Sequence, residues 1–118
     1  MNDLSTALTR MAPALEREIR PRLEGFVGAM VRSYLPQTWV FEADGEVASL
    51  TVDREGNASV AAHALPAPDV TIQAKREILL AALTRGREAP AHESDFHITT
   101  HTPKGRTAFS FLRQRFGI

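Results

Sequence analysis

Apolar residues recur at spacings of three and four along the first third of the chain, which is the period of a helical face. A short helix capped by Asn2 or Asp3 is expected to run through Met11. Pro13 suits the first turn of a second helix. The apolar stripe of that second helix consists of Leu15, Ile19, Leu23, Phe26, Val27, Met30 and Val31.

Pro21 interrupts this stripe. Proline lacks a backbone N–H and crowds the preceding turn, so a kink or break is expected near Arg20. Pro36 is expected to end the helical region. Residues 1–35 are therefore predicted to form the amino-terminal helices.

After residue 37 the pattern changes from helical spacing to alternation, which is typical of strands. Asp44-Gly45 is a strong turn pair, and Gly56-Asn57 supplies residues that tolerate a positive φ in a hairpin loop. Short hairpin connections predict an antiparallel meander over residues 38–73. The strands expected in it are 38–42, 46–52, 58–62 and 69–73.

The last third alternates between helix and strand. A helix is expected over 75–86, ending at a Gly86 C-cap, and a polar loop over 87–93. A fifth strand is expected within 95–101, and a terminal helix over 103–116 with Pro103 at its first position. The order predicts an α+β fold, with helices covering one face of an antiparallel sheet, as one domain spanning residues 1–118.

Charge and composition argue against several classes of function for this chain. The 118 residues contain 14 basic and 14 acidic side chains, so the neutral balance argues against a nucleic-acid-binding module. Cysteine is absent, which excludes disulfides, thiolate metal sites and a cysteine nucleophile. No stretch resembles a secretory signal or approaches the roughly 20 apolar residues that span a bilayer. A cytoplasmic protein without stable membrane insertion is expected.

From Thr38 onward the sequence resembles the sterol carrier protein type-two family. The resemblance is carried by the strand Trp39-Val40-Phe41 before Asp44-Gly45, and by the hairpin tip at 53–57. It continues through Ala67-Pro68-Asp69-Val70-Thr71-Ile72, the helix and glycine at 78–86, and the phenylalanine-rich end at 107–116. It implies a sheet of five strands with helices on one face and an apolar cavity between the two layers.

Members of that family bind sterols, fatty acyl chains or acyl-coenzyme A, and many are modules of larger assemblies. The resemblance therefore implies a small binding module for an apolar ligand. An apolar cavity needs large side chains that line a gap without filling it. The candidate lining residues are Phe26, Met30, Phe41, Leu50, Val70, Ile72, Leu79, Leu83, Phe109, Leu112 and Phe116.

The same residues are also compatible with a fold that has no cavity. Packed to ordinary density, they would form a dry core with no room for a ligand. The chain would then be a protein-interaction or scaffold subunit on the same fold. An exposed edge strand such as 96–100 would also be able to pair in a homodimer.

Basic residues gather in the last segment, where residues 103–118 carry four positive charges and no acidic residue. With the phenylalanines this predicts a basic amphipathic helix, able to meet a lipid headgroup or a coenzyme A phosphate. The alternative is a helix docked on the sheet with a solvated basic edge. The candidate anion contacts are Lys104, Arg106 and Arg113.

Signals for catalysis and metal binding are weak. No Gly-x-Ser-x-Gly elbow, phosphate-binding glycine loop or dinucleotide fingerprint is present. His97 and His101 are four residues apart, which on a strand separates them by roughly 13 Å. The histidines are expected to be solvated rather than metal ligands. We therefore expect no catalytic residues, no metal site and no cofactor.

Overall fold

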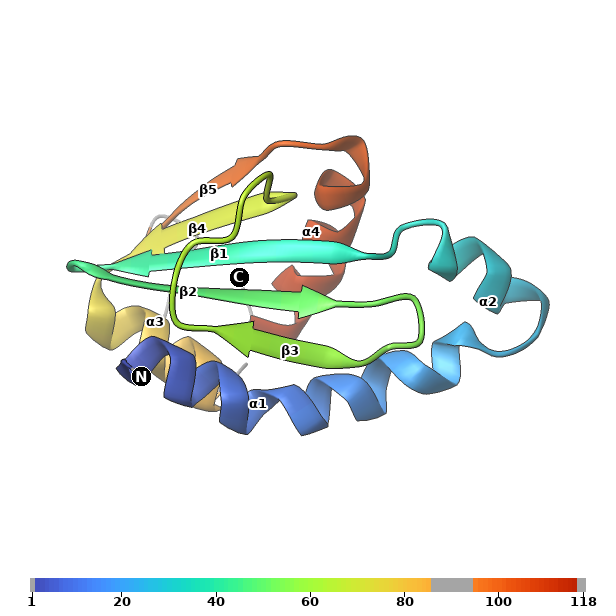
Figure 1. Ribbon diagram of the computed structural model, residues 1–118, viewed down its shortest axis with the longest axis horizontal. Coiled ribbons are helices and arrows are strands. Elements are labelled where there is room, and N and C mark those ends of the chain that lie inside the picture. The colour runs from blue at the N-terminus through green and yellow to red at the C-terminus, as the bar shows by residue number, and fades with distance from the viewer. Residues whose placement is uncertain (1, 86–94, 117–118) are drawn as a thin grey trace.

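A five-stranded sheet forms one layer of the computed structural model, which describes residues 2–85 and 95–116, with side chains of the last helix described as far as residue 110. The strands lie in the order β3-β2-β1-β4-β5 (Figure 1). They span β1 Gln37–Ala43, β2 Glu46–Val52, β3 Ala58–Ala61, β4 Val70–Ala74 and β5 Phe96–Thr100. With the helices described below, this confirms the α+β class.

Two tight hairpins build one half of the sheet. Asp44 and Gly45 both adopt a positive φ, of 47° and 86°, as the two-residue turn between β1 and β2 requires. In the β2–β3 loop, the backbone N–H groups of Glu55 and Asn57 donate to the Asp53 carboxylate. The bond from Asn57 is the main reason that the pKa of Asp53 lies below its ordinary value.

The sheet is not a pure antiparallel meander. β4 pairs with β1 in parallel, with Trp39 opposite Val70 and Phe41 opposite Ile72. The chain leaves the edge strand β3, crosses the sheet and returns beside β1, which fixes this direction (Figure 1). Ser49 anchors the crossing segment, because its hydroxyl donates to the His63 carbonyl and accepts from the Leu65 N–H.

The first helix is longer than the sequence predicts. α1 runs without interruption over Asp3–Ile19, so the expected second helix starting at Pro13 does not form. Asn2 caps α1 through a reciprocal pair of hydrogen bonds with Ser5. Pro13 lies on the exposed side of α1, where the hydrogen bond it removes leaves the Thr9 carbonyl near water. α1 tolerates the loss of this hydrogen bond because its opposite face is buried in the core.

The break expected near Arg20 is present. α1 gives way to a 3-10 turn, η1 Arg20–Leu23, and then to α2 Gly25–Arg32. Pro21 sits at the start of η1, where its missing N–H is not needed. Glu24 takes an extended conformation between η1 and α2 and so turns the chain.

The remaining helices are α3 Arg76–Arg85 and α4 Pro103–Phe116. The predicted cap at Gly86 and the polar loop at 87–93 lie outside the described residues. α1 packs on β2 and β3, whereas α4 packs near β1, β4 and β5, and α3 contacts α1 (Figure 1). Arg76 at the start of α3 forms ion pairs with Asp3 and Glu46, joining both helices to the sheet.

One helix departs from the prediction that every apolar stripe would cover the sheet. α2 lies beyond the ends of the strands and packs on η1 (Figure 1). The core forms instead where α1 and α3 meet the inward face of the sheet. Its most completely buried large side chains are Leu4, Leu8, Leu15, Phe41, Val70, Ile72 and Leu79.

Candidate functional site

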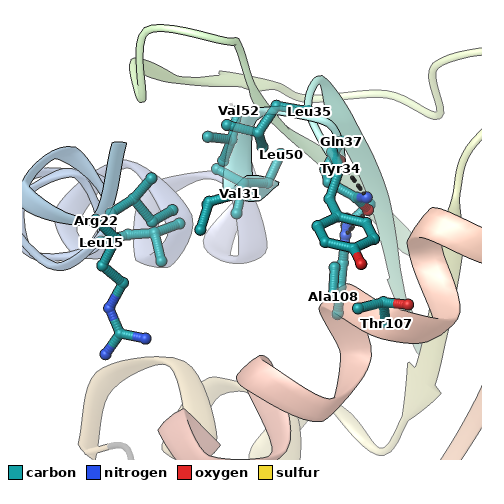
Figure 2. A pocket seen from close by; sticks show the side chains of 12 residues that line it. Leu15, Arg22, Val31, Tyr34, Leu35, Gln37, Leu50, Val52, Thr107 and Ala108 are labelled. Carbon is teal, nitrogen blue, oxygen red and sulfur yellow. Dashed lines mark hydrogen bonds between the residues drawn. The ribbon is translucent and has the colours of Figure 1, made fainter. Parts of the chain in front are cut away.

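An apolar pocket of about 220 Å³ opens between the sheet and the helices. It lies between α1 and α4, at the end of the sheet near η1 and the carboxyl-terminal end of α2 (Figure 2). Among the described residues, none from α3 lines the pocket, because α3 packs against α1 away from it. The pocket is lined by Leu15, Ile19, Arg22, Val31, Tyr34, Leu35, Gln37, Trp39, Leu50, Val52, Thr107 and Ala108.

The strands supply the floor of the pocket. Trp39 and Leu50 are direct partners across the β1–β2 pair, so their side chains share the inward face. Val52 lies two residues beyond Leu50 and therefore points to the same side. All three side chains are buried and turn their apolar surface toward the helices.

The polar groups in the wall largely satisfy one another. Gln37 is buried, and its amide donates to the carbonyls of Tyr34 and Lys104. The Gln37 oxygen in turn accepts a hydrogen bond of 3.0 Å from the Trp39 indole. These bonds use both N–H donors of the amide and one lone pair of its oxygen, so the interior offers mainly shape and apolar contact.

The exposed residues Arg22 and Tyr34 belong to the rim of the pocket. Figure 2 shows the Arg22 guanidinium directed away from the strands, on the side of α1. Thr107 of α4, also exposed, adds a hydroxyl group on the facing side. Polar character therefore increases from the floor toward the rim.

Of the predicted lining residues, Leu50 reaches this pocket. Phe109 is half-buried and packs against the core, one position after the pocket residue Ala108. Leu112 and Phe116 have side chains outside the described part of α4. The other predicted residues on the sheet and α3 are buried in the core without lining the pocket: Phe41, Val70, Ile72, Leu79 and Leu83.

Phe26 and Met30, expected to close the amino-terminal side of the cavity, do not line the pocket. Their exposed fractions are 93% and 62%. The physical reason is the turn at Glu24, which directs this face of α2 away from the sheet. Val31, one position after Met30, is the α2 residue that lines the pocket instead.

The predicted anion contacts lie around the start of α4. The Lys104 ammonium donates to the Pro36 carbonyl at 2.6 Å and lies 3.7 Å from the buried Asp69 carboxylate, so it connects α4 to the strands. Arg106 is exposed. The side chain of Arg113 falls outside the described residues, and contact of these residues with a ligand stays a prediction.

Sequence reasoning missed most of the pocket wall. Leu15, Ile19 and Val31 belong to the helical stripe, and Trp39 alternates with Phe41, so the apolar signal was present for each. The missing information was the position of the gap. It depends on how α1 and α4 are spaced over the sheet, which no local pattern encodes.

Within the described residues, no group of three or more histidine, aspartate or glutamate side chains is arranged to hold a metal ion. His101 lies against the Thr71 hydroxyl at 2.9 Å, on the outer part of the sheet. No helix in the described ranges has both the length and the apolar character to cross a membrane.

No protein-family model and no curated protein sequence matches the chain. Among solved structures, the chain is similar to a UbiJ-SCP2 ubiquinone synthesis protein, with a TM-score of 0.54 and 16% sequence identity over 93% of this chain and 90% of that one. It also matches part of Pisa1, a stereoselective inverting sec-alkylsulfatase from Pseudomonas sp., with a TM-score of 0.45 and 17% identity over 65% of this chain and 13% of the sulfatase. The first likeness shows an SCP2-like fold.

Proposed function

We propose that this SCP2-like chain is a small, non-catalytic binding module for an apolar ligand. The ligand class is a lipid or fatty acyl chain, free or as an acyl-coenzyme A, carried in the cytoplasm. The observation that carries the proposal is the apolar pocket between sheet and helices, which a filled core would lack. The SCP2-like fold of the UbiJ-SCP2 neighbour supports it.

The size of the pocket indicates how much of a ligand it holds. Its 220 Å³ is below the roughly 300 Å³ at which pockets for whole drug-sized molecules begin. At roughly 30 Å³ per group it accommodates about seven methylene-sized groups. Burying seven methylenes contributes roughly 6 kcal/mol before the ordering costs of binding. A segment of an acyl chain therefore fits, with the polar end of the ligand at the rim.

Trp39 provides a direct test, because it is the single tryptophan of the chain and lies in the pocket wall. Titration with a fatty acid brominated along its chain is expected to quench Trp39 fluorescence saturably, at micromolar ligand. Unlabelled fatty acid, acyl-coenzyme A and a sterol, added as competitors, would rank the ligand classes by the quenching that each relieves.

Ala108→Phe places a ring into the pocket from α4. Because the ring displaces several methylene contacts, we expect the Kd measured by this quenching to rise at least about tenfold. Ser110→Phe is the matched control: it adds a ring to an exposed position two residues along the same helix. Far-ultraviolet circular dichroism checks that both variants fold. Absence of saturable quenching in the wild type, or equal quenching in the two variants, would contradict the proposal.

A further inference from the structure

α2 presents an apolar face to solvent. Phe26 is 93% exposed, Val27 64% and Met30 62%, and Tyr34, also exposed, follows Met30 by four residues. Most soluble proteins expose large apolar side chains singly, whereas a contiguous group marks a binding surface. We call the set Phe26, Val27, Met30 and Tyr34 the α2 face.

The packing of α2 on η1 fixes which way the α2 face points. Gly28 is buried where the two meet, and a Cβ on it would collide with the backbone of Leu23. Val31 is half-buried and lines the pocket. With these two positions turned inward, the other apolar side chains of α2 remain in solvent at one end of the protein (Figure 1).

The α2 face is continuous with the pocket. Residues three and four apart on a helix are surface neighbours, with Cβ atoms roughly 5–6 Å apart. Val31 in the pocket wall is therefore next to Val27, and Val27 is next to Met30. Met30 in turn is next to Phe26. Tyr34 belongs to both surfaces, since it is exposed and lines the pocket (Figure 2). An apolar path thus leads from the pocket wall onto the outside of α2.

The pocket by itself is too small for a long acyl chain. Its 220 Å³ accommodates about seven methylene-sized groups. Because its interior is apolar, the methyl end of a fatty acid enters and the carboxylate stays in water. On a chain of about sixteen carbons, roughly eight methylenes next to the carboxylate then remain beyond the rim, where contact with water is unfavourable.

We propose that the α2 face is the outer half of the ligand site and covers the part of a long acyl chain that the pocket leaves outside. The inference rests on the proposed function and narrows its ligand class to long, flexible acyl chains. Such a chain can bend from the pocket onto α2, whereas a rigid sterol cannot. From Val31 back to Phe26 the helix rises about 7.5 Å, the length of about six methylenes in an extended chain.

Competitors of increasing length test the inference by displacing the brominated fatty acid that quenches Trp39. The competitors are octanoate, dodecanoate and hexadecanoate, each below the concentration at which it forms micelles. Octanoate fits within the pocket, whereas hexadecanoate also reaches the α2 face. In the wild type, Kd is therefore expected to fall at least about tenfold from octanoate to hexadecanoate, because the added methylenes leave water.

Val27→Ser with Met30→Ser removes the centre of the α2 face. The Kd of octanoate should stay within about twofold of wild type, whereas the Kd of hexadecanoate should rise at least about tenfold. Arg32→Ser is the matched control, because it shortens an exposed side chain on the opposite side of the same helix. It should keep the chain-length dependence of the wild type. Far-ultraviolet circular dichroism checks that all variants fold.

Three results would overturn the outer half of the site and leave the pocket function standing. They are equal Kd values for octanoate and hexadecanoate in the wild type, an unchanged chain-length dependence in the double variant, and an equal loss of both ligands in that variant. Sedimentation of a dimer that the double variant abolishes, with the chain-length dependence unchanged, would assign the α2 face to a second copy of the chain instead. Absence of any saturable quenching in the wild type would overturn the pocket function and this inference together.

Discussion

At the scale of single residues, Asp69 joins more of the fold than any local pattern suggests. Its carboxylate accepts from the Thr38 N–H at 2.9 Å and from the Thr102 hydroxyl at 2.7 Å. Its backbone N–H donates to the Thr38 carbonyl, and its carbonyl accepts from the His101 N–H. One buried residue thus ties the start of β1, the start of β4 and the approach to α4.

We expect Asp69→Ala to lower the free energy of unfolding by about 3 kcal/mol, because the part-buried Thr38 N–H and the Thr102 hydroxyl lose their carboxylate acceptor. Urea unfolding followed by Trp39 fluorescence measures this. Glu55→Ala, which removes an exposed loop carboxylate, should change it by less than about 0.5 kcal/mol. An equal decrease in the free energy of unfolding in the two variants would show that Asp69 stabilises the fold no more than an exposed loop carboxylate does.

At the scale of elements, α1 shows how tertiary packing overrides a local stop signal. A proline in a helix interior costs about 3 kcal/mol relative to alanine, yet α1 continues through Pro13. One face of α1, including Leu4, Leu8 and Leu15, is buried against the sheet and α3. Burial of each such leucine contributes roughly 1.5–3 kcal/mol, which exceeds the penalty when summed over the face.

Pro13→Ala is therefore expected to stabilise the protein by about 2 kcal/mol in thermal or urea unfolding. The substitution restores an N–H to α1, although it also loosens the unfolded chain. Pro21→Ala is the matched control, because Pro21 lies in the first turn of η1, where its missing N–H is not needed. Pro21→Ala should leave the free energy of unfolding unchanged or lower it slightly. A Pro13→Ala variant that unfolds more readily than wild type would refute the argument.

At the scale of the whole molecule, the pocket lies where the helical layer is incomplete. On one face of the sheet, α1 covers β2 and β3 and α4 packs near β1, β4 and β5, and the pocket remains between the two helices near η1. α2, with Phe26 and Met30 exposed to solvent, lies at the same end of the protein (Figure 1). A ligand that fills the pocket would join these helices through contacts that the unliganded protein lacks.

Ligand binding should therefore stabilise the entire fold by mass action. At a free concentration about a hundredfold above Kd, a fatty acid adds about 2.7 kcal/mol and raises Tm by on the order of 10 °C. Thermal unfolding followed by circular dichroism measures the shift. Ala108→Phe should show little shift and Ser110→Phe the full one; an equal shift in both would place binding outside the pocket.

The elements of this fold follow largely from the chain itself. The Asp44-Gly45 turn, the break at Pro21 and the terminal helix from Pro103 were predicted and are present. Each depends on a few neighbouring residues: two that accept a positive φ, and prolines that suit a first turn. The α+β class followed from the order of these elements.

Only the tertiary structure decided what each apolar face contacts. The parallel pairing of β1 with β4, the continuity of α1 through Pro13 and the outward turn of α2 all depend on distant segments. Periodicity shows that Phe26, Leu50 and Phe41 lie on apolar faces, and all three were predicted to line a cavity. Leu50 reaches the pocket, Phe41 is packed in the core, and Phe26 is in solvent, because burial is set by the arrangement of neighbouring elements rather than by the spacing within one.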